Sequence, residues 1–142
     1  MPVKILVFYP VQTNIFGKKF IMPTNHFIPL EQAKTMTSLY RGEMNNILAV
    51  PYHGKGILPI CETFDRAAFD TLLAETGCTA VRIYYGMSDD LKVHAVVVGV
   101  NSNNEDILPP AGNTLGTEED PVILEEATRC PDDCPPDSPV NS

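Results

Sequence analysis

The chain of 142 residues carries a formal net charge of −8 and 44% hydrophobic residues, as expected for one acidic domain with a packed core. This balance disfavours binding to nucleic acid or to an anionic membrane surface, because both depend on cationic contacts. The apolar run Ile5–Tyr9 is shorter than the central segment of a signal peptide and far shorter than a membrane span. We therefore expect a cytoplasmic protein.

The acids are concentrated towards one end of the chain. Residues 105–142 hold ten of the eighteen acids but a single base, and seven of the thirteen prolines lie at or after Pro109. Such a segment has little apolar surface to bury. The pattern predicts an N-terminal extension over residues 1–21, a single domain over residues 22–108, and an irregular acidic tail, rich in Pro and Cys, over residues 109–142.

The first part of the chain predicts one strand and two helices. The strand is Lys4–Tyr9. A helix is predicted over residues 29–41, because Pro29 suits the first helical position and apolar residues then recur at helical spacing. A second helix is predicted over residues 64–75, with Thr63 as its N-cap and a broad apolar face.

A β-hairpin over residues 79–101 gives the strongest strand signal. Its arms, Thr79–Met87 and Lys92–Asn101, are rich in β-branched and aromatic residues. A four-residue loop, Ser88–Leu91, predicts pairing between residues whose numbers sum to 179. Both faces of this hairpin are mostly apolar, which predicts a central position in the sheet.

Together these elements predict an α+β fold. An antiparallel sheet centred on the hairpin would be packed by both helices on one face. Ile107-Leu108 predicts the start of a third strand, and Val122–Thr128 predicts one or two helical turns. The second face of the hairpin needs cover, so the pattern also makes self-association a hypothesis.

A resemblance to other proteins is carried by four segments and one further residue: Ile28–Lys34, Gly77–Gly86, Val96–Asn101 and Cys130–Pro136, together with Asn141. From Met22 onward the chain resembles an uncharacterised family of small proteins from Bacteroidetes-type bacteria. The resemblance implies a recurring module with no established activity, and it makes Met22 an alternative to Met1 as the natural start.

Two cysteines of the acidic tail, Cys130 and Cys134, are the candidate metal ligands. Three residues separate them, which is within the spacing of a zinc knuckle. The other two cysteines flank a predicted helix, so His53 or His94 would have to complete the site. Two alternatives remain: a disulfide between Cys130 and Cys134, or thiols without a chemical role. No cofactor is predicted unless zinc binds there.

Two further constellations are weaker. The loop Tyr52–Gly56 holds a lysine between two glycines, a pattern that suits either an anion site or a turn. A nucleophilic scheme would join one of the other cysteines to a histidine, with an acid orienting the imidazole. The residues of this scheme are Cys61 or Cys78, His53 or His94, and Asp65 or Glu62.

Arg82 is unusual because it interrupts an apolar strand. A buried guanidinium needs a carboxylate partner, and Glu125 or Glu126 of the acidic tail could supply it. In the alternative interpretation, Arg82 lies on a partly exposed face with its stem over Tyr84.

The sequence indicates possible classes of function but identifies no substrate. The leading hypothesis is a small non-enzymatic binding or accessory module that contacts an unidentified protein through its acidic tail. The second is a metal-binding or redox-responsive protein that uses Cys130 and Cys134. A small enzyme with a Cys/His pair is the third.

Overall fold

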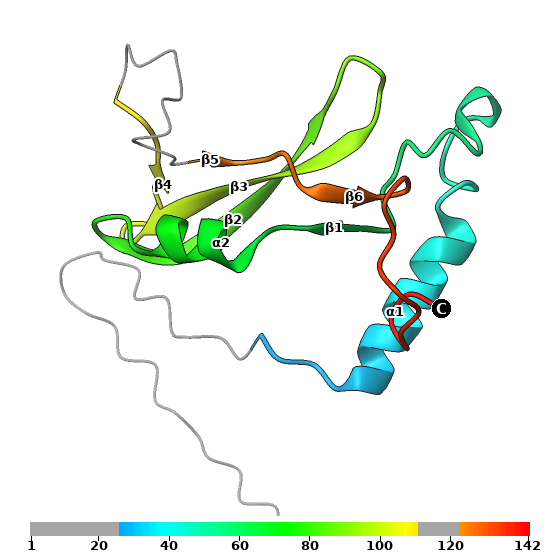
Figure 1. The fold of residues 1–142 in the computed structure, drawn as a ribbon, viewed down its shortest axis with the longest axis horizontal. Helices are drawn as coiled ribbons and strands as arrows, with labels where there is room; N and C mark the ends of the chain where they lie inside the picture. The colour runs from blue at the N-terminus through cyan, green and yellow to red at the C-terminus, as the bar shows by residue number, and fades with distance from the viewer. Residues whose placement is uncertain (1–25, 111–122) are drawn as a thin grey trace, which may run out of the picture.

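The computed structural model describes residues 26–110 and 123–142 (Figure 1). The predicted strand Lys4–Tyr9 and the alternative start at Met22 lie outside the described residues. In chain order, the described elements are α1 (Leu30–Glu43), the 3-10 helix η1 (Val50–Tyr52), β1 (Cys61–Thr63), α2 (Arg66–Leu73), β2 (Cys78–Met87), β3 (Val93–Asn101), β4 (Asp106–Ile107), β5 (Ile123–Leu124) and β6 (Thr128–Cys130).

The strands form two antiparallel sheets, so the predicted α+β fold is confirmed. In the larger sheet β3 is central, with β2 on one side and β4 and β5 on the other. The smaller sheet pairs β1 with β6. The third strand expected at Ile107-Leu108 is present as β4. Figure 1 shows β1 and β6 running on from the end of the larger sheet towards α1.

The β2–β3 hairpin is confirmed, but its predicted register is wrong by one residue. From Ala80 to Met87 of β2, paired residue numbers sum to 180, so that Arg82 lies opposite Val98; a register shift separates this stretch from the pair of Cys78 with Asn101. The reason is the turn: Ser88 N–H donates to Lys92 O, and Leu91 adopts a left-handed backbone with φ 66°. This is a three-residue loop, in which the left-handed position is usually glycine or asparagine. Because this position holds a leucine, the sequence did not indicate a three-residue loop.

The hairpin as a whole is not central. β3 is hydrogen-bonded on both sides, which explains why Val97, Val98 and Val100 are buried. Within the described part of the chain, β2 has β3 as its single neighbour and is an edge strand. Apolar side chains on both faces of β2 therefore reflect something other than burial in the middle of the sheet.

α2 packs on the larger sheet and forms the core with it. Leu72 is 0% exposed and contacts Val97 of β3 and Leu124 of β5. Phe64 and Phe69 close the side of this cluster with their rings edge to face, 5.7 Å apart. The predicted helix is thus present but shorter. Thr63 is the last residue of β1 rather than the N-cap, and Asp65 takes the N-cap position.

α1 does not cover the sheet, contrary to the prediction that both helices pack on it. It contains no buried residue, and Figure 1 shows it beyond the smaller sheet. Two residues near its C-terminal end hydrogen-bond to the rest of the chain: Tyr40 donates a 2.7 Å hydrogen bond to the Pro59 carbonyl, and Arg41 binds the carbonyls of Val140 and Ser142. The weakly amphipathic sequence of α1 fits this position.

The described part of the acidic tail is more regular than predicted. The expected helical turns at Val122–Thr128 are wrong, because β5 pairs with β3, and β6 pairs with β1. Residues 131–142 then follow without a helix or strand and end beside α1 (Figure 1). Residues 123–130 therefore belong to the same folded unit as the sheets. Among the described residues, no helix has the length and apolar character needed to cross a membrane.

Candidate functional site

His94 lies between two carboxylates and a serine hydroxyl. Its Nδ1 is 3.2 Å from Glu125 Oε1 and 3.4 Å from Glu62 Oε1, and its Nε2 is 3.3 Å from Ser88 Oγ. These residues come from β3, the acidic tail, β1 and the hairpin turn. The predicted register, with residue numbers that sum to 179, would have placed His94 opposite Tyr85; in the structure His94 pairs with Gly86, so the side chains of His94 and Tyr85 lie on opposite faces.

Glu62 is the buried member of this group. Its side chain is 7% exposed, and its Oε2 accepts a 2.7 Å hydrogen bond from the backbone N–H of Ala95. Among the described residues, Glu62 Oε1 has no hydrogen-bond partner and faces the His94 ring. A protonated imidazole at this position would neutralise part of the charge of two carboxylates.

The group has the outline of a Ser–His–Glu triad but not its proton arrangement. Ser88 Oγ lies 2.5 Å from Asp90 Oδ1, and this hydroxyl bond, with Lys92 nearby, lowers the pKa of Asp90. Ser88 has one hydroxyl hydrogen, and the ionised Asp90 can only accept it. With this hydrogen directed to Asp90, Ser88 has no second proton to offer the imidazole. The geometry links strands and does not activate a nucleophile.

The predicted Cys/His scheme is not assembled either. Glu62 does approach His94, as one version of the scheme required. Cys78, however, pairs with Asn101 at the far end of the hairpin from His94, and Cys61 points to the opposite face of β1 from its neighbour Glu62. His53 is exposed, with its Nε2 2.9 Å from the Leu48 carbonyl. The described structure supplies no cysteine beside an imidazole.

An open pocket of about 510 Å³ lies where the acidic tail meets the body; we call it the acidic pocket. Phe64, Ala68 and Leu124 provide apolar walls, and the described lining contains no basic residue. Three exposed carboxylates stand around it: Asp65 at the start of α2, and Glu125 and Glu126 after β5. Its complete lining is Thr63, Phe64, Asp65, Ala68, Ile123, Leu124, Glu125, Glu126 and Thr128.

Cys130 and Cys134 form a disulfide, with their Cα atoms 4.5 Å apart. Cys130 is 2% exposed at the end of β6, whereas Cys134 is exposed. Asp132 and Asp133 stand exposed within the closed loop. In the described ranges no three His, Cys, Asp or Glu side chains are arranged to hold a metal ion. The zinc hypothesis concerns the reduced chain and stays a prediction.

Arg129 anchors this loop to the body. Its guanidinium donates to four carbonyl oxygens: Gly56 at 2.7 Å, Ile57 at 3.0 Å, Pro131 at 3.1 Å and Val93 at 3.2 Å. A planar group with five N–H donors suits several carbonyls that converge on one point. Sequence reasoning did not single out this residue, although the signal was present: Arg129 is the one base among residues 105–142.

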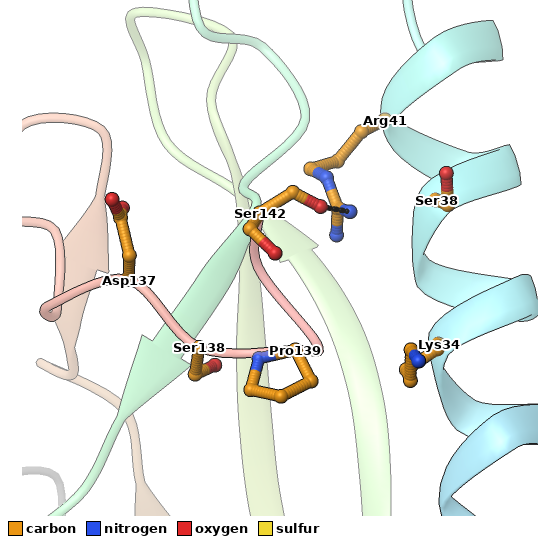
Figure 2. Close-up of a pocket in the computed structure, with 7 residues that line it drawn as sticks. All are labelled: Lys34, Ser38, Arg41, Asp137, Ser138, Pro139 and Ser142. Carbon is orange, nitrogen blue, oxygen red and sulfur yellow. Dashed lines mark hydrogen bonds between the residues drawn. The ribbon is translucent and has the colours of Figure 1, made fainter.

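A second open pocket, of about 570 Å³, lies between α1 and the end of the chain. Figure 2 shows Arg41 reaching from α1 to the Ser142 carbonyl, with Ser138 and Pro139 along the facing segment. Lys34 and Arg41 line one side and Asp137 the other. Both bases already have partners, since Lys34 pairs with Glu31 on its own helix. Neither base of this pocket's lining is therefore free to bind an anionic ligand.

Arg82 has a carboxylate partner, but it is neither Glu125 nor Glu126, the two candidates from the acidic tail. Its guanidinium pairs with Asp106 of β4 and donates a 2.7 Å hydrogen bond to the Asn104 side chain. Tyr84 donates to the other Asp106 oxygen over 2.6 Å. The hydrogen bond with Tyr84 and the charge of Asp106 raise the pKa of Arg82. Glu125 and Glu126 lie elsewhere, at the acidic pocket.

Comparisons of the chain with protein-family models, with curated proteins and with solved structures found no match. The resemblance to a Bacteroidetes-type family therefore stays a prediction.

Proposed function

We propose that this protein is a small non-enzymatic binding module whose acidic tail, together with the start of α2, receives a basic side chain of a protein partner. The observation that carries the proposal is the acidic pocket, in which Glu125 and Glu126 of the tail lie beside Asp65 of the body. Strand pairing of β5 with β3 holds the tail in place at this point.

The chemistry of the pocket favours a lysine or arginine from a partner. Phe64, Ala68 and Leu124 offer apolar contact for the aliphatic part of such a side chain. The carboxylates around them favour the charged head, and no base of the described lining competes for them. The exposed Asp132 and Asp133 of the disulfide loop extend the same negative charge along the tail.

Binding of a model basic peptide tests the proposal. A fluorescently labelled peptide that alternates lysine and leucine should bind, whereas the same peptide with glutamate in place of lysine should not. Affinity for the first should fall as salt concentration rises, because exposed charge pairs are screened. A double variant, Asp65→Asn with Glu126→Gln, should weaken binding by about tenfold. It leaves Glu125 and its contact with His94 intact.

The matched control removes two acids away from the pocket, Glu75→Gln with Asp89→Asn, for the same change in net charge. Equal loss of binding in both double variants would show that net charge alone attracts the peptide. That outcome, or no binding of the lysine peptide to the native protein, would overturn the proposal.

A second candidate function is a redox response, which the disulfide between Cys130 and Cys134 favours. Exposed Cys134 gives a thiol reagent access to the bond, and reduction would open the loop that holds Asp132 and Asp133. Under this hypothesis, peptide affinity should change when the bond is reduced, and Cys134→Ser should reproduce that change. Identical affinity in the oxidised and reduced protein would exclude the redox hypothesis and leave the binding module unaffected.

A further inference from the structure

The exposed edge of the larger sheet is a candidate interaction surface outside the acidic pocket. β2 is ten residues long and, among the described residues, has a hydrogen-bonded neighbour on one side alone. Edge strands of folded proteins are usually short, or carry lysine or proline that blocks pairing with another chain. β2 contains neither residue. Its large exposed side chains are Val81, Ile83, Tyr84, Tyr85 and Met87, between 40% and 82% exposed.

The hydrogen-bonding pattern shows which residues of β2 face outward. The backbone N–H groups of Val93 and Ala95 in β3 point away from β2, since they donate to the Ile57 carbonyl and to Glu62. Their register partners are Met87 and Tyr85. In an antiparallel pair, residues that do not bond to the partner direct their N–H and C=O groups to the other side. By alternation, Ile83 likewise directs its backbone groups to the free edge.

The charge of this edge determines what can pair with it. The segment Thr76–Ser88 contains no acid, in a protein with a net charge of −8. Its one base, Arg82, is already paired with Asp106. The acids Glu125 and Glu126 follow β5, which lies on the other side of β3 from β2. A strongly charged partner gains nothing here, whereas an uncharged, extended apolar strand does, and a second copy of the chain brings that strand.

We propose that two copies of this chain associate through antiparallel pairing of their β2 edges, with Ile83 opposite its counterpart in the second copy. This register overlaps nine residues and places Val81 opposite Tyr85 of the second copy. Arg82 then lies opposite the second copy's Tyr84, a favourable cation–aromatic pair. The neighbouring register with equal overlap would place Arg82 opposite itself, and like charges directly opposite are unfavourable.

The dimer would join two larger sheets into one continuous sheet. An interface made of one strand pair is smaller than the ~1,200–2,000 Å² of stable specific complexes. We therefore expect a reversible dimer that forms with a dissociation constant on the order of micromolar or weaker. Sedimentation velocity over a series of protein concentrations should show a shift from monomer to dimer.

Substitution at the centre of the interface provides the first test. Ile83→Lys places two like charges at the two-fold axis and should raise the dissociation constant at least tenfold. Met36→Lys, on the exposed side of α1, adds the same charge at a residue of similar exposure (57%, against 51% for Ile83) and should leave it unchanged. Circular dichroism checks that both variants fold. A monomer at every concentration of the native protein would overturn the proposal. That is also the result expected if another segment of the same chain pairs with the β2 edge.

Crosslinking tests the register and does not depend on whether Ile83→Lys folds. Ile83→Cys and Val81→Cys are compared after Cys61 and Cys78 have been changed to serine, using a short thiol-reactive crosslinker. The Cα atoms of two copies should be about 5.5 Å apart at position 83 and more than ~13 Å apart at position 81. Efficient crosslinking of Ile83→Cys alone supports the register. Equal crosslinking of both variants, or of neither, contradicts it.

Discussion

The carboxylate of Glu62 accepts a 2.7 Å hydrogen bond from the backbone N–H of Ala95. Glu62 lies in β1 of the smaller sheet and Ala95 in β3 of the larger sheet, at a position where β3 has no strand to bond on that side. A side chain thus replaces a strand neighbour and joins the two sheets. The same carboxylate faces His94, which also contacts Glu125 of the acidic tail.

Loss of this carboxylate should destabilise the protein. Glu62→Ala leaves the N–H of Ala95 without its acceptor, and we expect the free energy of unfolding to fall by about 1–3 kcal/mol in urea denaturation. Glu62→Gln keeps an oxygen that can accept the bond and should recover most of the loss. Equal destabilisation by both substitutions would mean that the negative charge, rather than the hydrogen bond, provides the stability.

Arg129→Ala should be more damaging than loss of an ordinary surface arginine. It removes the donor to four carbonyls that join the disulfide loop to Gly56, Ile57 and Val93. We expect a loss of roughly 3 kcal/mol, because hydrogen bonds to charged groups are the stronger ones. Limited proteolysis should also cut residues 131–137 faster. Arg129→Lys keeps the charge without the planar fork and should recover only part of the stability; full recovery would contradict this account.

Leu72→Ala tests the core that α2 forms with the larger sheet. Leu72 is 0% exposed and packs against Val97 and Leu124, so its truncation should cost about 2–5 kcal/mol. The adjacent Leu73 is 51% exposed and provides a matched control for the same chemical change. Leu73→Ala should have a much smaller effect. Similar losses of stability at the two positions would contradict this assignment of the buried face of α2.

We expect the protein to lose stability at high pH, where the phenol of Tyr40 ionises. Burial raises the pKa of Tyr40 above its ordinary 10.0, and the Arg129 guanidinium partly offsets that rise. The neutral phenol donates to the Pro59 carbonyl. Because the folded-state pKa is the higher one, this stabilisation is present below pH 10 and is lost as pH rises through the folded-state pKa. Urea denaturation between neutral pH and pH 11 should show the decline, and Tyr40→Phe should flatten that part of the profile.

Much of the fold could be predicted because the signals were local. The hairpin at residues 79–101 and the helix at Arg66–Leu73 follow from β-branched runs and from helical periodicity, which neighbouring residues determine. The register failed because it depended on Leu91, whose left-handed backbone is rare for a leucine. A one-residue change in loop length was then enough to give Arg82 and His94 cross-strand partners different from the predicted ones.

The acidic tail shows where local signals end. The sequence by itself determined the concentration of acids, the spacing of Cys130 and Cys134, and the candidate role of the tail, because composition and spacing are properties of the chain. The tertiary structure decided that β5 pairs with β3, that Arg129 binds carbonyls from two distant segments, and that β2 is an edge. These contacts join residues far apart in the chain, and short-range pattern does not encode such pairings.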